Sequence, residues 1–319
     1  MPLAEYYLGV DGGQSSTTAL ICNESGRVLG RGRGGPCNHA SGDEGRRKFF
    51  HAVGSCLSEA CKEAGLNAAM IEFQAACLGF SGGAADKKQY SRELIRTRHL
   101  YVTHDAEIAL TGATAGSPGI IIIAGTGSMA FGGNSQGRTA RAGGWGYVFG
   151  DEGGGFDMAR KALRAALRME EGWGRDTTLY SDLLEATRSP DADTLLHRLY
   201  TSEFSRPEVA ALSRLVTRAA EAGDHVATEI LDESAKELSV YVGGVHRNLF
   251  SSEACPAICY IGGVFRSRIL LERFQDVIKQ KLGVTPGAPK LSPAAGALLM
   301  ALRQDRKTSQ LENLPSSEK

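Results

Sequence analysis

Two stretches of this chain share one plan, and that plan limits the fold more than any other feature of the sequence. Residues 9–21 read GVDGGQSSTTALI: an apolar run, a tip of glycine and hydroxyl residues, and a second apolar run. Residues 119–133, GIIIIAGTGSMAFGG, repeat that order. Either tip alone could be an ordinary hairpin turn, which needs only one or two such residues. Two such tips predict a duplicated pair of domains whose backbone N–H groups and hydroxyls bind phosphate.

The segments around each tip alternate between strand-like and helical patterns, which predicts an α/β layer architecture. Strand-like runs with turn signals fill residues 6–31, and apolar residues at helical spacing follow over 43–64. Helical patterns dominate from about residue 156 to about residue 247. We expect an N-terminal lobe at 1–115, joined by a C-terminal helix at 293–303. The second lobe would cover 116–292 with a helical part at 156–250, and 304–319 would form a frayed polar tail.

Charge and cysteine content exclude several classes of function. Lys plus Arg equals Asp plus Glu, 36 against 36 in 319 residues, so no net field attracts nucleic acid or an anionic membrane. The start MPLAEYYLGVDGG lacks a basic segment, so we expect no signal peptide, and Ile120–Ala124 is too short to span a bilayer. The seven cysteines form no C-x-x-C pair, which favours reduced packing thiols in a cytoplasmic protein without a zinc or iron–sulfur site.

The sequence lacks the common nucleotide-binding motifs. No G-x-x-x-x-G-K-[ST] occurs, so the chain is not a P-loop protein. GRGRGG at residues 30–35 fits G-x-G-x-x-G, but Pro36 follows it at once. A dinucleotide-binding fold requires a helix N-terminus at that place, so we reject that interpretation.

GFSGG at residues 79–83 fits the G-x-S-x-G pattern of serine hydrolases, with Ser81 as the nucleophile. Asp105 and His225 follow in a workable order. A hydrolase would leave the paired glycine tips unexplained, and no HGGG-type segment precedes the serine. A serine hydrolase is therefore retained as the alternative.

Two aspartates stand where strands are expected to end. Asp105 closes the run LYVTHD, where it could accept a proton from an attacking alcohol or cap the following helix. Asp11 follows the first strand directly, where it could hold Mg²⁺ through water or start a turn.

Two further glycine-rich segments suggest ligand contacts. GGWGYVFGDEGGG at 143–155 surrounds Trp145, Asp151 and Glu152 just before a strong helix. Because a loop so rich in glycine is costly to order, we interpret it as a binding loop with Trp145 as a platform. YIGGVFRS at 260–267 places Gly262 and Gly263 at a strand end, where adenine could approach bare backbone.

Taken in order, GVDGG, FSGG, HDA, AGTGS, GGWGYVFGDEG and GGVFRS resemble the sugar kinase, Hsp70 and actin superfamily. Within it, the chain is most similar to the BadF/BadG-type ATPases, the group that contains N-acetylglucosamine kinase. The resemblance implies two duplicated ribonuclease H-like lobes, each with a five-stranded mixed sheet and helices, around a nucleotide cleft. It further implies an ATP-dependent kinase that phosphorylates the 6-hydroxyl of an amino sugar.

The resemblance also assigns roles to residues. Asp105 becomes the general base and Asp11 holds Mg²⁺ through water. The residues expected to bind ATP are Gly12, Gly13, Ser15, Gly125, Thr126, Gly127, Gly262, Gly263 and Ser267. Those expected to bind the sugar are Asn38, Ser81, Asp105, Gly144, Trp145 and Asp151.

The resemblance narrows the substrate without fixing it. N-acetylglucosamine is the first choice, while kinases of N-acetylmuramic acid and glucosamine share these motifs. A regulatory ATPase that binds sugar and ATP without transferring phosphate is a second alternative. Gly154 departs from the pattern, since these kinases commonly have serine after DEG. The tip AGTGSMAFGG carries no cysteine, which sets aside the iron–sulfur activators of the same family. A homodimer is common among such kinases and is the assembly that the resemblance suggests.

Overall fold

The computed structural model describes residues 5–37, 42–81, 85–201, 203–250, 256–305 and 310–318. The chain divides into two compact units, one from Met1–Pro118 and Pro289–Lys319 and the other from Gly119–Ala288. We call them unit 1 and unit 2. The boundaries expected from the sequence, 115/116 and 292/293, lie close to these.

Unit 1 is built on a five-stranded mixed sheet in the order β3-β2-β1-β4-β5. Strands β1, β2 and β3 run antiparallel, while β4 and β5 are parallel to β1. The strands are β1 (Tyr6–Gly12), β2 (Thr17–Asn23), β3 (Val28–Gly34), β4 (Phe73–Phe80) and β5 (Thr97–His104). Its helices are α1 (Gly42–Glu63), α2 (Ala85–Leu94), α3 (Asp105–Thr114) and α11 (Pro293–Gln304), followed by the short η2 (Ser316–Glu318).

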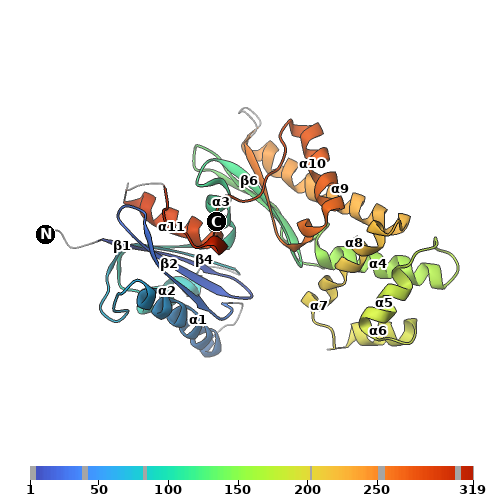
Figure 1. Cartoon of the computed structure of the whole chain (residues 1–319), viewed down its shortest axis with the longest axis horizontal. Coiled ribbons are helices and arrows are strands. Elements are labelled where there is room, and N and C mark those ends of the chain that lie inside the picture. The colour runs from blue at the N-terminus through green and yellow to red at the C-terminus, as the bar shows by residue number, and fades with distance from the viewer. Residues whose placement is uncertain are drawn as a thin grey trace. The chain divides into compact units, whose positions relative to one another are not determined.

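Helices cover both faces of this sheet, because side chains alternate between two buried faces along β1 and β2. Leu8 and Val10 pack with α1 on one face, and Tyr7 and Leu20 pack with α11 on the other. Figure 1 shows α1 and α2 on one side of the sheet and α11 on the opposite side. The carboxyl ends of β1, β4 and β5 carry Asp11, Ser81 and Asp105.

The rejected GRGRGG motif has a packing role in this sheet. A Cβ atom on Gly32 would lie 1.8 Å from the carbonyl oxygen of Cys56, so only glycine lets α1 lie this close to β3. On the outer edge of β3, the N–H groups of Arg31 and Arg33 donate to the carboxylates of Glu63 and Glu59, at 2.9 and 2.7 Å.

The tail expected to be frayed is folded onto unit 1 over residues 310–318. The backbone of Glu312 exchanges hydrogen bonds with Gly26 and Val28, at 3.0 and 2.9 Å. Glu318 is buried, accepts a hydrogen bond from Ser292 at 2.6 Å and forms an ion pair with Arg31 at 2.7 Å. The polar composition was misleading because charged side chains can be buried when they are paired.

Unit 2 repeats the sheet plan with one strand fewer. Its order is β8-β7-β6-β9, with β6, β7 and β8 antiparallel and β9 parallel to β6. The strands are β6 (Gly119–Ala124), β7 (Ser128–Gly133), β8 (Thr139–Gly143) and β9 (Ala257–Ile261). The expectation of five strands in this lobe is wrong for the described residues, because a single parallel bridge between Cys259 and Gly287 occupies the fifth position.

Helices of unit 2 fill the chain between β8 and β9 and also follow β9. They are α4 (Gly155–Glu170), α5 (Leu179–Thr187), α6 (Ala192–Tyr200), α7 (Arg206–Ala211), α8 (Ser213–Glu221), α9 (His225–Leu249), η1 (Gly263–Arg266) and α10 (Arg268–Leu282). The long helix α9 packs against β6, β7 and β8, and α10 lies along α9 (Figure 1).

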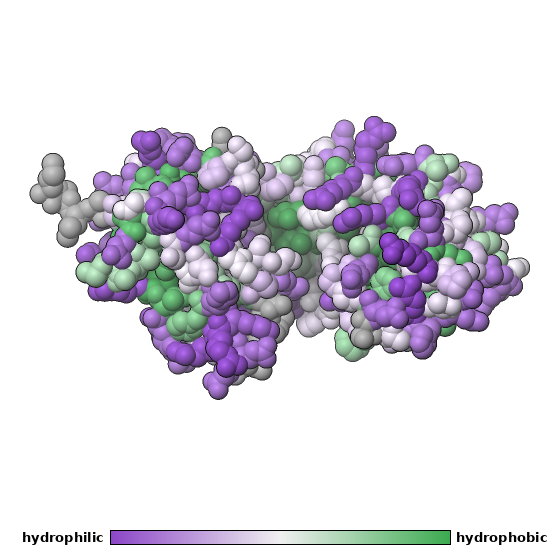
Figure 2. All heavy atoms as spheres, turned by 60° about the horizontal axis from the view of Figure 1, so that its bottom comes forward, coloured by the Kyte–Doolittle hydropathy of each residue, from purple (hydrophilic) through white to green (hydrophobic). Residues whose placement is uncertain are grey.

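The predicted fold class is confirmed, since both units are mixed α/β sheets of one topology. On the face drawn in Figure 2, hydrophilic and hydrophobic residues are interspersed over each unit. None of the helices in the described ranges is long and apolar enough to cross a membrane.

Candidate functional site

The first glycine tip connects β1 to β2 and is open to solvent. The register pairs Gly12 with Thr17, which leaves Gly13–Ser16 as the turn. The N–H of Gly13 donates to the carbonyl of Ser16 at 3.0 Å, and the N–H of Cys37 donates to Gly13 at 3.0 Å. Gln14, Ser15 and Ser16 are exposed, and their N–H groups form no hydrogen bond with any described residue. These donors are available to an anion.

Asp11 lies next to this tip and lacks a hydrogen-bonding partner among the described residues. Burial, together with the negative charges of Asp105 and Glu318, raises the pKa of its carboxyl group to about 7. A carboxylate in that position is destabilised unless a cation compensates it. A single carboxylate of this kind suits a magnesium ion held through water, and the metal role of Asp11 stays a prediction. No cluster of three or more metal-ligating side chains occurs in the described part of the chain.

Asp105 is the first residue of α3 and follows β5 directly. The sequence allowed Asp105 to be either a proton acceptor or the N-cap of the following helix. In the structure the N-cap is His104. Its Oδ1 accepts a hydrogen bond from the N–H of Ala106 at 2.9 Å, and its Oδ2 accepts one from the hydroxyl of Ser81 at 2.6 Å. The fold thus brings together two predicted site residues that are far apart in the sequence.

The contacts of Ser81 differ from those of a hydrolase nucleophile. Its hydroxyl donates directly to Asp105, whereas the nucleophile of a G-x-S-x-G hydrolase donates to a histidine. No hydrogen bond joins Ser81 to a histidine in the described ranges. Asn38, a further predicted sugar ligand, lies outside the described residues.

Sequence reasoning missed Lys87 of α2. Its ammonium group donates to the carbonyl oxygens of Ser81 and Cys37 and lies 5.3 Å from the centre of the Phe80 ring. Lys87 therefore connects the end of β4 with the segment that follows β3. Its position in a charged helix, ADKKQYSREL, gave no signal for this role.

The second glycine tip, residues 125–127 between β6 and β7, is held firmly by its neighbours. The N–H groups of Gly155 and Phe156, at the start of α4, donate to the carbonyls of Gly125 and Thr126 at 2.8 and 3.0 Å. A Cβ atom on Gly127 would lie 2.3 Å from the carboxylate of Asp151. The N–H groups of Thr126 and Gly127 bond to no other described residue, so they are free to donate.

Close packing at this tip also bears on Gly154, which stands where similar kinases commonly have serine. A Cβ atom on Gly154 would lie 2.9 Å from the carbonyl carbon of Gly127, closer than Cβ atoms normally come. The serine common at this place in the resembling kinases would therefore require the tip to shift. Gly154 is also the N-cap of α4 and supplies no side-chain cap.

Asp151 lies at the centre of the loop between β8 and α4. It has a left-handed backbone with φ of 64°, and its side chain is buried. Its Oδ1 accepts a hydrogen bond from the N–H of Ser128 at 3.4 Å, and its Oδ2 forms an ion pair with Arg206. Sequence reasoning missed Arg206, which lies on α7. Both carboxylate oxygens of Asp151 thus have partners within unit 2, although each can accept a second hydrogen bond.

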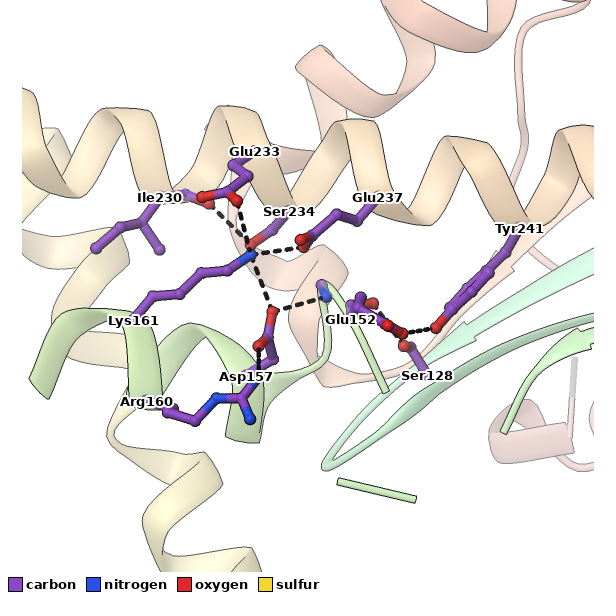
Figure 3. Close-up of polar contacts among 11 residues, drawn as sticks. Ser128, Glu152, Asp157, Arg160, Lys161, Ile230, Glu233, Ser234, Glu237 and Tyr241 are labelled. Atoms are coloured by element: carbon purple, nitrogen blue, oxygen red, sulfur yellow. Dashed lines mark hydrogen bonds and ion pairs between the residues drawn. The ribbon is translucent and has the colours of Figure 1, made fainter. Parts of the chain in front are cut away.

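Side chains of α4 and α9 fix the rest of this loop, as Figure 3 shows. The hydroxyl of Tyr241 donates to the carboxylate of Glu152, and Ser128 donates to the Glu152 carbonyl at 2.6 Å. Asp157 accepts a hydrogen bond from the N–H of Gly153 at 3.1 Å. Burial alone would raise the pKa of Asp157, but hydrogen bonds from Lys161 and neighbouring groups hold it below its usual value.

Gly144 and Trp145, the other predicted sugar ligands in unit 2, precede Asp151 on the same loop. Gly144 has a φ of 73°, and its N–H donates to Ser128 at 3.0 Å. The Trp145 ring is exposed, with the guanidinium of Arg141 4.8 Å from its centre. An exposed ring held at a fixed loop can act as a platform for a ligand.

A cavity of about 500 Å³ lies beside the second tip. Its lining includes Gly125, Thr126, Gly263 and Ser267, four of the residues predicted to bind ATP. A Cβ atom at Gly125 or Gly263 would meet nothing within 4 Å, so bare backbone faces open space there. The volume is within the usual range for small-molecule sites.

Gly127 and Gly262, both predicted to bind ATP, are not among the residues that line this cavity. Gly262 has a φ of 117°, and a Cβ atom there would lie 2.2 Å from the carbonyl oxygen of Ala124. A Cβ atom on Gly127 would likewise come too close to the Asp151 carboxylate. Close packing therefore requires glycine at both positions, whether or not they also contact a ligand. Ser267 is the N-cap of α10, where its hydroxyl accepts a hydrogen bond from Leu270.

A family model described as the BadF/BadG/BcrA/BcrD ATPase family matches residues 8–301. The chain belongs to the BadF/BadG/BcrA/BcrD ATPase family. The resemblance stated from the sequence is therefore confirmed, and membership of this ATPase family indicates ATP as the nucleotide.

Two curated relatives and one solved structure are similar to this chain over most of its length. An N-acetylmuramic acid/N-acetylglucosamine kinase of Clostridium acetobutylicum is 34% identical over 270 residues, 82% of this chain and 86% of the relative. An N-acetyl-D-glucosamine kinase of Dictyostelium discoideum is 28% identical over 95% of this chain and 99% of its own. The structure of a candidate N-acetylglucosamine kinase from Chromobacterium violaceum matches with a TM-score of 0.73 and 26% identity, over 93% of this chain and 99% of that one.

Proposed function

We propose that this protein is an ATP-dependent kinase that phosphorylates the 6-hydroxyl of an amino sugar, with N-acetylglucosamine as the first substrate to test. The observation that carries the proposal is the carboxylate of Asp105. It lies at the end of β5, hydrogen bonded to Ser81 and electrostatically coupled to Asp11. The kinase names of relatives that match nearly the whole chain support the reaction type.

Unit 1 supplies the groups for proton transfer in this proposal. Asp105 accepts the proton of the sugar hydroxyl as it attacks the terminal phosphate of ATP. Ser81 donates to Asp105 in the structure, and a sugar hydroxyl can take its place or share the acceptor. Asp11 holds Mg²⁺ through water, and the ion neutralises charge on the phosphates when it is bound.

Unit 2 supplies the nucleotide pocket. The free N–H groups of Thr126 and Gly127 and the hydroxyl of Thr126 are suited to phosphate oxygens. The open backbone at Gly263 allows a flat base to approach closely. Trp145, Gly144 and Asp151 belong to the sugar site in this proposal, as does Asn38. In unit 1, phosphate contacts come from Gly12 at the end of β1 and from Gly13 and Ser15 of the first tip.

The experiment that tests this proposal is an assay of ADP release with ATP and Mg²⁺ over a panel of free sugars. The panel contains N-acetylglucosamine, N-acetylmuramic acid, glucosamine and glucose. We expect sugar-dependent ADP release, and mass spectrometry should find the phosphate on the 6-oxygen. Sugar binding by calorimetry without ADP release would instead favour the regulatory alternative. Ester cleavage without nucleotide, with labelling of Ser81 by a fluorophosphonate, would establish the hydrolase alternative.

The remaining proposals concern the setting of the enzyme. Six described cysteines are buried free thiols, which suits the reducing cytoplasm that we propose. We also propose a homodimer, to be measured by light scattering at several protein concentrations.

A further inference from the structure

A second cavity in unit 2 belongs to neither the proposed nucleotide pocket nor the proposed sugar ligands. It has a volume of about 740 Å³ and lies between α4, α6 and the start of α7. Most of its lining is apolar, including Leu163, Leu195, Leu199 and Phe204. We call it the α4–α6 cavity. Its size suits a small molecule with a substantial apolar body.

The charged side chains of this cavity all have the same sign. Its described lining residues include Arg160, Arg164 and Arg206 but no aspartate or glutamate. Arg164 is exposed and forms no ion pair or hydrogen bond with any described residue. An apolar wall with an unpaired guanidinium favours an organic anion over a neutral or cationic ligand.

The other two arginines keep part of their bonding capacity unused. Arg160 donates through Nη2 to Asp157 at 2.6 Å, and Arg206 donates through Nη2 to Asp151. The Nε atom of each guanidinium is buried without an acceptor. Carboxylates bind guanidinium groups side-on through Nε and Nη2, so each of these arginines still has an unused donor of the kind that a second carboxylate would need.

Arg206 links this cavity to the predicted sugar ligand Asp151. Its guanidinium lies 5.1 Å from the centre of the Tyr147 ring, and Tyr147 lines the cavity on the loop that carries Trp145. A ligand that draws on Arg206 alters the ion pair with Asp151. If Asp151 binds sugar as proposed, occupancy of the cavity would thereby be coupled to affinity for sugar.

We propose that the α4–α6 cavity binds an organic carboxylate with an apolar body, and that Arg206 couples its binding to the sugar site. The binding half of this proposal is independent of the proposed kinase function, whereas the coupling half rests on it. The carboxylate could belong to a separate small molecule or to a substituent of the sugar itself. The chemistry is the same, and the experiment separates the two sources.

The binding test uses calorimetry and thermal melting with sodium octanoate, kept below its micelle concentration. The comparison ligands are 1-octanol, octylammonium and acetate, which remove the charge, reverse it or remove the apolar body. We expect saturable binding of octanoate, at least about tenfold weaker binding of 1-octanol, and no measurable binding of octylammonium or acetate. Equal binding of octanoate and octylammonium would overturn the proposal, as would the absence of saturable octanoate binding.

Two variants locate the site. Arg164→Gln removes the unpaired charge and should weaken octanoate about five- to tenfold. Leu196→Glu places a negative charge at an exposed lining position and should abolish binding. Arg168→Gln, on α4 but outside the lining, and Val240→Glu, exposed on α9, are the matched controls and should leave binding unchanged. Octanoate binding that neither lining variant weakens would place the site elsewhere and reject the assignment.

The source of the carboxylate is read from kinetics with two sugars. If the substrate carries it, Arg164→Gln should raise KM for N-acetylmuramic acid and leave KM for N-acetylglucosamine unchanged. If a separate molecule carries it, octanoate should change KM for N-acetylglucosamine at least twofold in the wild type and not in Leu196→Glu. Octanoate binding with neither kinetic response would overturn the coupling. Absence of all sugar phosphorylation would refute the proposed function while leaving the calorimetric result intact.

Discussion

The two glycine tips occupy equivalent places in the two units but differ in how they are held. In the tip at 13–16 of unit 1, residues 14–16 are exposed, one backbone hydrogen bond closes the turn, and one more, from Cys37, reaches Gly13 from outside it. The tip at 125–127 in unit 2 receives two hydrogen bonds from the start of α4 and packs against Asp151 and Gly154. One sheet plan therefore supports both a lightly held loop and a braced one.

The carboxylates near the two tips also differ, because the one in unit 2 is paired with a cation. In unit 1, Asp11 has no cationic partner among the residues that the structure describes. The pKa of its carboxyl group is raised by burial, and Asp105 lies close enough to contribute to that shift. In unit 2, the nearby carboxylate of Asp151 is paired with Arg206. In the proposed kinase, unit 1 would supply the carboxylates for metal binding and proton transfer, and unit 2 a fixed framework for the nucleotide.

The largest expected effect concerns the proton acceptor in unit 1. Asp105→Asn keeps the shape of the side chain but removes its ability to take a proton. We expect kcat in the ADP-release assay to fall about 10²- to 10⁴-fold, with an unchanged melting curve. Asp276→Asn, on the exposed surface of α10, is the control and should retain full activity. Near-normal turnover of Asp105→Asn would show that this residue is not the general base.

Two alanine substitutions test the packing of the second tip against Asp151. Gly127→Ala places a Cβ atom 2.3 Å from the Asp151 carboxylate and should lower the free energy of unfolding by about 1–3 kcal/mol. Gly125→Ala meets nothing within 4 Å and should leave stability unchanged while weakening nucleotide binding. Thermal melting and nucleotide titration measure the two effects. Equal stability of both variants would mean that the tip is not braced by Asp151.

The smallest effect concerns the uncompensated charge of Asp11. Its folded pKa of about 7 exceeds the unfolded value of about 4, so the folded state binds the proton more tightly. Wild-type stability without metal should therefore fall as pH rises from about 4 to about 7 and change little above that. Asp11→Asn should be more stable than wild type at pH 8 by on the order of 2 kcal/mol, allowing for partial exposure.

The Asp11→Asn advantage should disappear near pH 4 and shrink when Mg²⁺ and ATP are added, because the cation stabilises the ionised wild-type side chain. Urea titrations at several pH values measure it. Asp43→Asn, in the exposed first turn of α1, is the control that should lack this pH dependence. A constant difference between Asp11→Asn and wild type across pH would contradict an uncompensated charge at Asp11.

Local sequence patterns predicted the features that depend on local chemistry. The apolar runs on both sides of each tip became antiparallel strands, because a strand and its turn are encoded by neighbouring residues. The repeat of that pattern predicted two units of one topology. Asp105 was singled out because it was expected at the end of a buried strand, where sheets present functional side chains. It does follow β5, but β5 is a partly exposed edge strand.

Contacts between distant segments were not predictable from one sequence. The pairing of Asp151 with Arg206 joins residues 55 positions apart, and neither neighbourhood marks the other. The ligand roles assigned to Gly127 and Gly262 stay predictions, but the neighbours within unit 2 that exclude a side chain at each position were not foreseen. The docked segment at 310–318 was missed because its burial depends on Arg31 and Ser292, which lie far away in the sequence.

The covered margin of β3 has a consequence for how the protein behaves in concentrated solution. An uncovered outer strand offers a row of donors and acceptors on which another chain can assemble. Here Glu59, Glu63 and the segment around Glu312 already occupy donors of that margin. Removing both glutamates would turn β3 into a template for fibre-like self-association, visible as turbidity long before any loss of the fold.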